Sequence, residues 1–459
     1  MARAKTPNAH LAALIDEAGI SNAGLAHRVI ELSRARGITA PRYNHASVAR
    51  WINGEQPRGI VPDLIAEIFT GLVGRAITRP DIGMTEAARI DTALDYPADI
   101  EQAVETAATL YGADVHRRNI LAKSAYTAAA YCVPALRWMT APTADLLDRS
   151  GTTRVGAGQV MAIRELTATF RRIDNQLGGG HARSSVVQYL ADEVAPLLKH
   201  GTYAGPVGRD LFAAASEMTL LAGWMAYDLE QHPIAQRYLI QALRLAQAAG
   251  DHALGGEILA AMAAQAAYLG DGSGAVDLAR AAARSAKSAG SGALLSESLA
   301  VEAHGHARLG DARNCASLLV LAHGALDSSA DEPEFLAYYD PAYLAARTGR
   351  ALLDCGDTAG AARSLRASLT MQAGYQRGRV FNLAVLATVL SQDGTVDEAC
   401  EMAVQAAVGA RGLASSRVQS ELRVLAGALA PHGSAPVVAR TLQQLPPAKR
   451  GVRALPAAR

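Results

Sequence analysis

A pattern of small residues recurs five times in the second half of the chain and restricts the fold more than any other feature of the sequence. Each copy holds three residues at intervals of four and three, with small side chains at the outer positions, and a Gly or Ala stands twelve positions earlier. The trios are Ala235/Leu239/Ala242, Ala275/Ala279/Ala282, Cys315/Leu319/Ala322, Ala361/Leu365/Ser368 and Ala399/Ala403/Ala406, and the earlier residues are Gly223, Ala263, Ala303, Gly349 and Ala387. Turn signals, such as Leu-Gly-Asp at 269–271 and 309–311, recur at the same offset within the copies. The pattern predicts consecutive pairs of closely packed helices.

Small residues at these positions are what a tetratricopeptide unit requires, because its helices cross closely there. Successive trios lie 40, 40, 46 and 38 residues apart, which is longer than the spacing of about 34 in the standard unit. We therefore expect a degenerate array of tetratricopeptide-like helix pairs over residues 211–432. Such pairs stack into a curved α-solenoid whose concave face suits peptides, partner proteins or small ligands.

Composition favours helices along the whole chain. Half of the 459 residues are hydrophobic but only 5% are aromatic, and Ala and Leu carry much of the apolar share, which favours helices over sheets. We predict an all-α fold with more than one domain, because the chain is too long for one compact core. Residues 1–79 are expected to form a first domain, 80–98 a linker, 99–210 a helical region with diverged repeats, and 433–459 a disordered tail rich in Pro, Ala and Arg.

The N-terminal domain is predicted to contain four short helices. Ser21 is a suitable N-cap for the second helix. In the third helix Val48, Trp51 and Ile52 share one face, so we expect these side chains in the core.

The opposite face of the third helix carries polar side chains at its start. Asn44, His45, Ser47 and Arg50 are expected to face outward, where a recognition helix presents donors and acceptors to base edges. Residues 1–80 also carry ten Arg or Lys against six Asp or Glu, an excess of the sign that DNA binding requires.

These motifs resemble a known family. The Gly24-Leu25-Ala26 segment followed by Trp51-x-x-Gly54-x-x-Pro57 resembles the XRE (Cro/repressor-like) helix-turn-helix family. The resemblance is closest to the members from high-GC Gram-positive bacteria that carry tetratricopeptide repeats, the NsdA-like regulators of development and antibiotic production. The segments 110–121, 170–183, 189–193 and 222–228 resemble the same regulators. One departure is the Gly37–Tyr43 connection, which is longer than the turn of about three to four residues in compact helix-turn-helix motifs.

The resemblance implies a transcriptional regulator that binds double-stranded DNA. The residues expected to contact DNA are Ser21, Asn22, Tyr43, Asn44, His45, Ser47, Arg50 and Arg58. Because one recognition helix reads few base pairs, we expect a homodimer, with the repeat array as its dimer surface. The alternative is a helical bundle that mediates protein contacts, which would make the chain an interaction scaffold that does not bind DNA.

A run of three glycines, residues 178–180, is the leading candidate for effector binding. Arg171 and Arg172 precede the run, and His181 and Arg183 follow it. No strand pattern precedes the run and no Gly-Lys-Ser/Thr follows it, which excludes the usual nucleotide-binding loops. Two helix ends with clustered Arg and His suit an anion, so a small anionic effector, or a peptide with a free carboxylate, is expected here. The alternative is a flexible loop.

Tyr227 and Arg237 are further effector candidates. They belong to a group of aromatic, charged and amide side chains near the start of the array, a mixture suited to an effector or peptide pocket. Ordinary packing is the alternative interpretation of this group.

The sequence predicts no catalysis, cofactor or metal. It has no recognisable nucleophile motif or paired carboxylates, and the four cysteines stand singly. The N-terminus lacks the apolar segment of a signal peptide, and no apolar run reaches the length of about 18 residues typical of a membrane span. We expect a cytoplasmic regulator that is not an enzyme and has no membrane partner.

Overall fold

The computed structural model describes residues 7–35, 43–57, 61–75, 77–79, 81–84, 93–121, 125–140, 148–328 and 332–448. The chain divides into two compact units, Met1–Ile90 and Asp91–Arg459. The predicted all-α fold is confirmed: among the described residues the only strands are β1 (Thr153–Arg154) and β2 (Gly201–Thr202), which pair in parallel. No helix in the described parts of the chain is both long and apolar enough to cross a bilayer.

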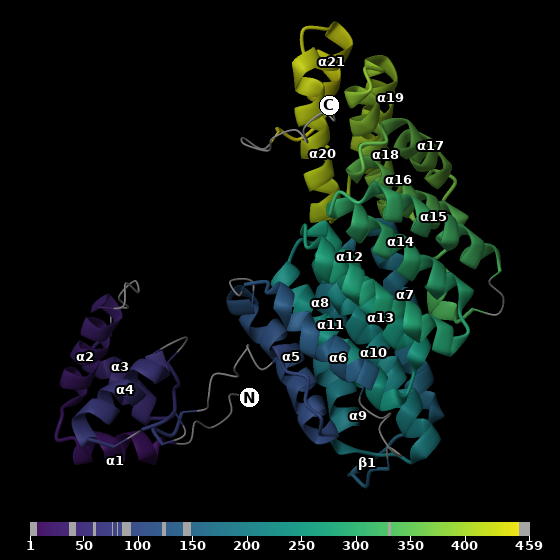
Figure 1. Ribbon diagram of the computed structural model, residues 1–459. Helices are drawn as coiled ribbons and strands as arrows, with labels where there is room; N and C mark the ends of the chain where they lie inside the picture. The colour runs from purple at the N-terminus through teal and green to yellow at the C-terminus, as the bar shows by residue number, and fades with distance from the viewer. Residues whose placement is uncertain are drawn as a thin grey trace. The chain divides into compact units, whose positions relative to one another are not determined.

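The first unit contains four helices around one core (Figure 1). They are α1 (Ala9–Glu17), α2 (Asn22–Ala35), α3 (His45–Ile52) and α4 (Val61–Val73). Trp51 is buried, as expected, together with Leu25, Val48 and Phe69. Each helix therefore contributes a short apolar face to a core that none of them forms alone.

The first unit extends beyond α4. Asn8 caps α1 by accepting a hydrogen bond from the Leu11 amide at 3.0 Å, and its side-chain amide donates to the carbonyl oxygens of Ile82 and Gly83 at 3.0 and 3.2 Å. Ile82 and Met84 are fully buried in the same core. The prediction that a linker begins at residue 80 is therefore wrong.

The predicted linker 80–98 is also wrong at its other end. Gln241 donates to the carbonyl oxygens of Ala93 and Asp95, both at 2.9 Å, and Arg244 donates to that of Pro97 at 2.6 Å. Residues 93–98 therefore pack on the second unit. Residues 85–92 lie outside the described residues.

The second unit is a stack of helices. Its first part contains α5 (Ile100–Leu121), η2 (Ala128–Tyr131), α6 (Cys132–Thr140), α7 (Ala157–Leu177), α8 (Gly179–Tyr189), η3 (Leu190–Val194) and α9 (Ala195–His200). The array contains α10 (Gly205–Asp228), α11 (His232–Ala249), α12 (His252–Tyr268), α13 (Gly272–Ala289), α14 (Gly292–Arg308), α15 (Ala312–Asp327), η4 (Glu334–Leu336), α16 (Pro341–Asp354), α17 (Thr358–Ser368), α18 (Gln376–Gln392), α19 (Val396–Gly409), α20 (Ser416–Leu429), η5 (Ala430–His432) and α21 (Pro436–Leu442). Helices α7 and α8 pack on each other and on α10, and α5 packs on α11.

The repeat pattern has the predicted phase. All five trios are buried and lie on α11, α13, α15, α17 and α19, the second helices of successive pairs. The earlier small residues lie on the first helices, where a larger side chain would collide: a Cβ on Gly223 would approach Tyr238 Cβ to 3.0 Å, and one on Gly349 would approach Leu365 Cγ to 2.7 Å. Small side chains here allow the two helices of a pair to approach closely.

The turns between the paired helices also follow the sequence. In the Leu-Gly-Asp turn at 269–271, Gly270 has a φ of +89°, a conformation that favours glycine. Asp271 then caps α13 by accepting a hydrogen bond from the Gly274 amide at 2.9 Å. Asp311 and Asp357 cap α15 and α17 in the same way, after Gly310 and Gly356 with positive φ.

The C-terminal segment is ordered further than predicted. Helices α20 and α21 lie beside α19 at the yellow end of the chain (Figure 1). Val438 and Leu445 are buried in the core formed with α18, α19 and α20. The predicted disorder of 433–459 is therefore wrong for residues 433–448, and residues 449–459 lie outside the described residues.

Two leucines of α4 test the packing of the first unit. Leu64 is 0% exposed and Leu72 is 36% exposed. Leu64→Ala should lower the free energy of unfolding of a fragment spanning residues 1–90 by about 2–5 kcal/mol, because it opens a cavity in the core. The matched Leu72→Ala should cost less than about 1 kcal/mol. Urea unfolding followed by circular dichroism measures both, and equal losses would contradict this core assignment.

Candidate functional site

Helix α3 begins with a capping box that fixes which side chains face outward. Asn44 accepts a hydrogen bond from the Ser47 amide at 3.1 Å, and the Ser47 hydroxyl accepts one from the Asn44 amide at 3.4 Å. Ser47 is 4% exposed because its side chain completes this box. The expectation that Ser47 lies on the outward face is therefore wrong.

The remaining polar residues of α3 are available at the surface. Asn44, His45 and Arg50 are exposed. Arg50 is held loosely by Glu55, with 3.8 Å between Nε and Oε1. Tyr43 is half-buried, and its ring packs edge-on against Trp51 at 5.1 Å between centroids. Partial burial raises the pKa of Tyr43. Because its ring packs against Trp51, Tyr43 contributes to the core of the first unit.

The other predicted DNA contacts lie at the start of α2 or outside the described residues. Ser21 is exposed and its hydroxyl accepts a hydrogen bond from the Gly24 amide at 3.1 Å, as expected of an N-cap. Asn22 is half-buried. Arg58 lies outside the described residues.

The glycine run at 178–180 is a place of close packing. Gly178 ends α7 with a φ of +87°, and the Gly180 amide donates to the Ala414 carbonyl at 2.9 Å. A Cβ on Gly179 would come within 2.7 Å of the Met225 carbonyl oxygen. The Gly179 amide, at the N-terminus of α8, donates to Asp228 Oδ2 at 3.0 Å. The carboxylate that meets this helix end is therefore the protein's own.

The residues predicted to surround this run do not converge. Arg183 is buried and forms an ion pair with Asp114, which also accepts a hydrogen bond from Tyr238 at 2.9 Å. His181 is exposed, with Nε2 at 2.9 Å from the Gly412 carbonyl oxygen. The expected cluster of Arg and His around an anion is therefore not formed.

Two other predicted residues have local partners. Arg172 is exposed and donates to the Thr169 hydroxyl at 3.1 Å. Arg237 is buried and donates to the Pro233 carbonyl at 2.8 Å on its own helix. Arg171 and Tyr227, by contrast, line a cavity in the second unit.

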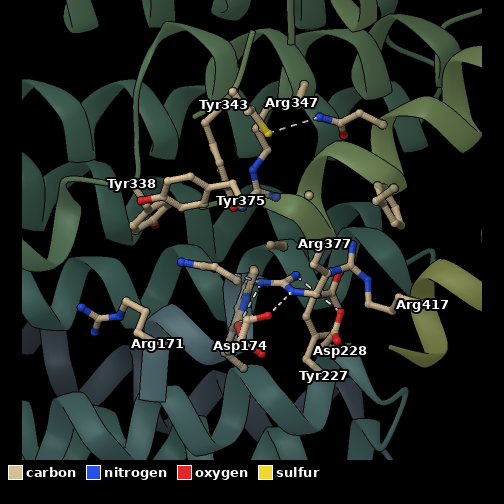
Figure 2. A pocket seen from close by; sticks show the side chains of 18 of the residues that line it. Arg171, Asp174, Tyr227, Asp228, Tyr338, Tyr343, Arg347, Tyr375, Arg377 and Arg417 are labelled. Atoms are coloured by element: carbon tan, nitrogen blue, oxygen red, sulfur yellow. Dashed lines mark hydrogen bonds and ion pairs between the residues drawn. The ribbon is translucent and has the colours of Figure 1, made fainter. Parts of the chain in front are cut away.

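This cavity lies among the first helices of successive pairs, namely α7, α10, α12, α14, α16, α18 and α20. Its volume is about 190 Å³. Although the chain is only 5% aromatic, eight aromatic side chains line it, together with five arginines. These are Trp224, Tyr227, Tyr268, Phe335, Tyr338, Tyr343, Tyr375 and Phe381, and Arg171, Arg347, Arg350, Arg377 and Arg417. Figure 2 shows Tyr338, Tyr343, Tyr375 and Arg347 facing Asp174, Tyr227, Asp228, Arg377 and Arg417 across the cavity.

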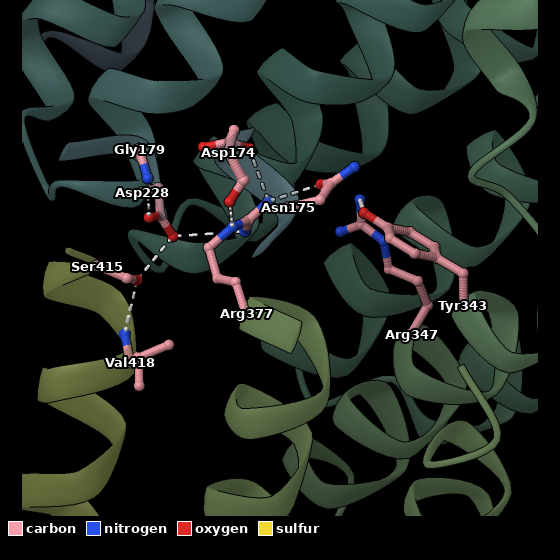
Figure 3. Close-up of polar contacts among 9 residues, drawn as sticks. All are labelled: Asp174, Asn175, Gly179, Asp228, Tyr343, Arg347, Arg377, Ser415 and Val418. Carbon is pink, nitrogen blue, oxygen red and sulfur yellow. Dashed lines mark hydrogen bonds and ion pairs between the residues drawn. The ribbon is translucent and has the colours of Figure 1, made fainter. Parts of the chain in front are cut away.

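One wall of the cavity is an ion-pair network (Figure 3). Arg377 donates to Asp174 Oδ2 at 2.9 Å and to Asp228 Oδ1 at 3.4 Å. Asp228 also accepts a hydrogen bond from Ser415 at 2.9 Å, and Ser415 in turn caps α20. Asp228 thus joins α8, α10, α18 and α20.

Burial changes the acidity of this network. Asp174 is almost fully buried, which raises its pKa to about 6, although the neighbouring Arg377 acts in the opposite direction. Asp228 contributes to the rise, because a second negative charge disfavours ionisation of the first.

The opposite wall holds a hydrogen-bonded chain of acids. The Tyr338 hydroxyl lies 2.6 Å from both Glu257 Oε1 and Glu297 Oε2, and Arg347 donates to Glu297 at 2.9 Å. Burial, and the charge of Glu297, raise the pKa of Glu257 well above its usual value. The Tyr338 hydroxyl has one proton, so it donates to only one of these two carboxyl groups at a time.

Arg417 lies close to three aromatic rings of the cavity, whereas Arg347 lies over one, that of Tyr343 at 5.4 Å. The guanidinium carbon of Arg417 lies 4.3 Å from the ring centroid of Tyr227, 4.7 Å from that of Phe381 and 5.1 Å from that of Tyr268. Among the described residues Arg417 forms no ion pair, and its buried Nε has no hydrogen-bond partner. Arg417 is not among the residues predicted from the sequence to bind an effector. A usable signal was the recurrence of Arg and aromatic residues on first helices, as in Arg347, Arg377 and Phe381.

Comparison with known proteins concerns the first unit. A family model described as the SP15 N-terminal domain matches residues 11–85. The matched range includes α2–α4, most of α1 and the packed segment up to Met84, so it agrees with the extent of the first unit. The search of curated proteins gave no match to this chain.

The acidity of Asp174 gives a prediction for stability. Because its pKa is raised on folding, the folded protein holds a proton more tightly than the unfolded chain, and stability from this group falls as pH rises from about 4 to about 6. The unfolding free energy of the wild type minus that of Asp174→Asn should therefore be larger at about pH 4.5 than at about pH 6.5. Urea unfolding at both pH values measures this difference. A larger difference at the higher pH would mean that the carboxylate is stabilised, not destabilised, by its surroundings.

Proposed function

We propose that this protein is a DNA-binding transcriptional regulator that acts in the cytoplasm. In this proposal the first unit contacts double-stranded DNA through the outward face of α3, and the cavity of the second unit binds a small effector. The role is one of binding rather than catalysis.

The observation that carries the DNA-binding half is the division of α3 into two faces. Val48 and Trp51 are buried, while Asn44, His45 and Arg50 are exposed on a short, capped helix. Amide, imidazole and guanidinium groups are the donors and acceptors that proteins use for base edges and phosphates. The resemblance of the segment Trp51-x-x-Gly54-x-x-Pro57 to XRE regulators supports the same role.

The effector half is supported by the cavity. A concave site with many aromatic side chains and a few charged groups is the usual form of a small-molecule site. The second unit is joined to the first by the chain between Met84 and Ala93, so the unit that contains the cavity is covalently linked to the proposed DNA-binding unit.

Arg50 provides a direct test of DNA binding. Full-length protein would first select its preferred sequences from fragmented genomic DNA, and the best fragment would then be titrated at fixed salt, because affinity depends on ionic strength. Arg50→Ala should weaken binding by about 1–3 kcal/mol while leaving the melting curve unchanged. Arg75→Ala is the matched control, because its side chain is 55% exposed against 59% for Arg50, and it pairs with Glu17 at the ends of α1 and α4.

Two outcomes would oppose this assignment. Equal affinity of wild type and Arg50→Ala would remove α3 as the recognition helix. Genome-wide binding without sharp promoter peaks would favour the interaction scaffold that does not bind DNA.

We further propose that the protein acts as a homodimer through its repeat array. Two recognition helices on a two-fold operator double the number of base contacts. Light scattering after size-exclusion chromatography should give twice the mass of 47.9 kDa for the full chain, with or without DNA. A strict monomer at micromolar concentration in both conditions would contradict dimerisation.

A further inference from the structure

The size of the cavity restricts the ligand. Its volume of about 190 Å³ exceeds the roughly 150 Å³ of an apolar cavity that holds benzene. It therefore has room for a molecule with one ring and one or two substituents, but not for a nucleotide or a folded peptide segment.

The arginines of the cavity differ in how their charges are balanced. Arg171 pairs with Glu217 at 2.8 Å, Arg350 with Glu421 at 3.0 Å, and Arg347 with Glu297 at 2.9 Å. Arg377 is shared between two aspartates. Arg417 has no carboxylate partner among the described residues. The guanidinium of Arg417 can therefore pair with one negative charge on a ligand.

The position of Arg417 favours a carboxylate. Its guanidinium is partly shielded from water by the rings of Tyr227, Tyr268 and Phe381, which strengthens a charge-assisted hydrogen bond. A guanidinium presents a planar fork of donors that matches the two oxygens of a carboxylate. A doubly charged phosphate would instead face the acids of the network around Asp174 and Asp228.

Two acceptor oxygens at the cavity have no hydrogen-bond partner. They are Asp174 Oδ1 and Glu257 Oε2, both buried. Glu257 Oε1 is hydrogen-bonded to the Tyr338 hydroxyl, whereas Oε2 has no partner. A buried acceptor without a hydrogen-bond partner costs free energy. A ligand with an O–H or N–H group that donates to one of these oxygens therefore binds with higher affinity.

We propose that the cavity binds a small aromatic monocarboxylic acid that carries a hydroxyl or amino group. The carboxylate meets Arg417, the ring lies among Trp224, Phe335 and Tyr375, and the donor meets Asp174 or Glu257. The inference rests on the proposed effector role of the cavity, but it does not rest on DNA binding.

Isothermal titration calorimetry of the full chain without DNA tests this inference. The probes are 4-hydroxyphenylacetate, phenylacetate and the neutral 4-hydroxyphenylacetamide, with inorganic phosphate and a short apolar peptide with a free carboxylate as further arms. The hydroxylated acid should bind most tightly, and both phenylacetate and the amide should bind more weakly by about tenfold or more. Because wild-type protein is used, this comparison does not depend on the folding of any variant.

Variants of Arg417 identify the group that binds the carboxylate. Arg417→Gln should reduce affinity for 4-hydroxyphenylacetate by about tenfold or more, and Arg417→Lys, which keeps the charge but not the planar fork, by less. Arg366→Gln is the control, because Arg366 is exposed and pairs with Glu398 outside the cavity. Circular dichroism melting establishes that each variant is folded.

Several results would overturn the inference. They are the absence of binding by either aromatic acid, equal binding of acid and amide, equal binding of phenylacetate and its hydroxylated form, and binding of only phosphate or only the peptide. Unchanged affinity in folded Arg417→Gln would exclude Arg417 as the anchor. If these assays succeed while DNA binding fails, the cavity keeps its ligand and only the regulator proposal is lost.

Discussion

The carboxylate of Asp228 joins parts of the second unit that are far apart in the sequence. It accepts hydrogen bonds from the Gly179 amide at the start of α8 and from Ser415, 187 positions further along the chain than Asp228 itself, and it pairs with Arg377 at the start of α18. A buried charge is costly unless it is paired and hydrogen-bonded. Asp228 meets this condition only when α8, α10, α18 and α20 are together, and the cavity lies among these helices.

The repeat geometry explains why the cavity has such a different composition from the rest of the chain. Close packing within a pair uses small residues, as between Gly349 of α16 and Leu365 of α17. The inner face of each first helix is not used for that contact, so it can carry large side chains. Tyr227, Arg347 and Arg377 lie on this face in three different pairs. The aromatic and guanidinium side chains of the cavity therefore come from segments that are far apart in the sequence and share no local motif.

The parts of the fold that the sequence predicted are those determined by neighbouring residues. The trios, the Leu-Gly-Asp turns and the burial of Trp51 depend on contacts within one helix pair or one small unit. Ser47 was predicted to be exposed but is buried, because its hydroxyl takes part in the capping box of α3. The packing of residues 93–98 and 433–448, and the partners of Arg183 and Arg417, depend on contacts across long distances in the sequence, which periodicity does not encode.

Hydrogen exchange of the full chain, measured by mass spectrometry for wild type and Asp228→Asn, tests most directly whether Asp228 holds the cavity together. The substitution keeps the size of the side chain but removes its charge. If Asp228 has this role, exchange becomes faster in three separate segments, at the N-termini of α8, α18 and α20, with no change in α13, which contributes no residue to the cavity. Faster exchange confined to α10, or none at all, would contradict this role of Asp228.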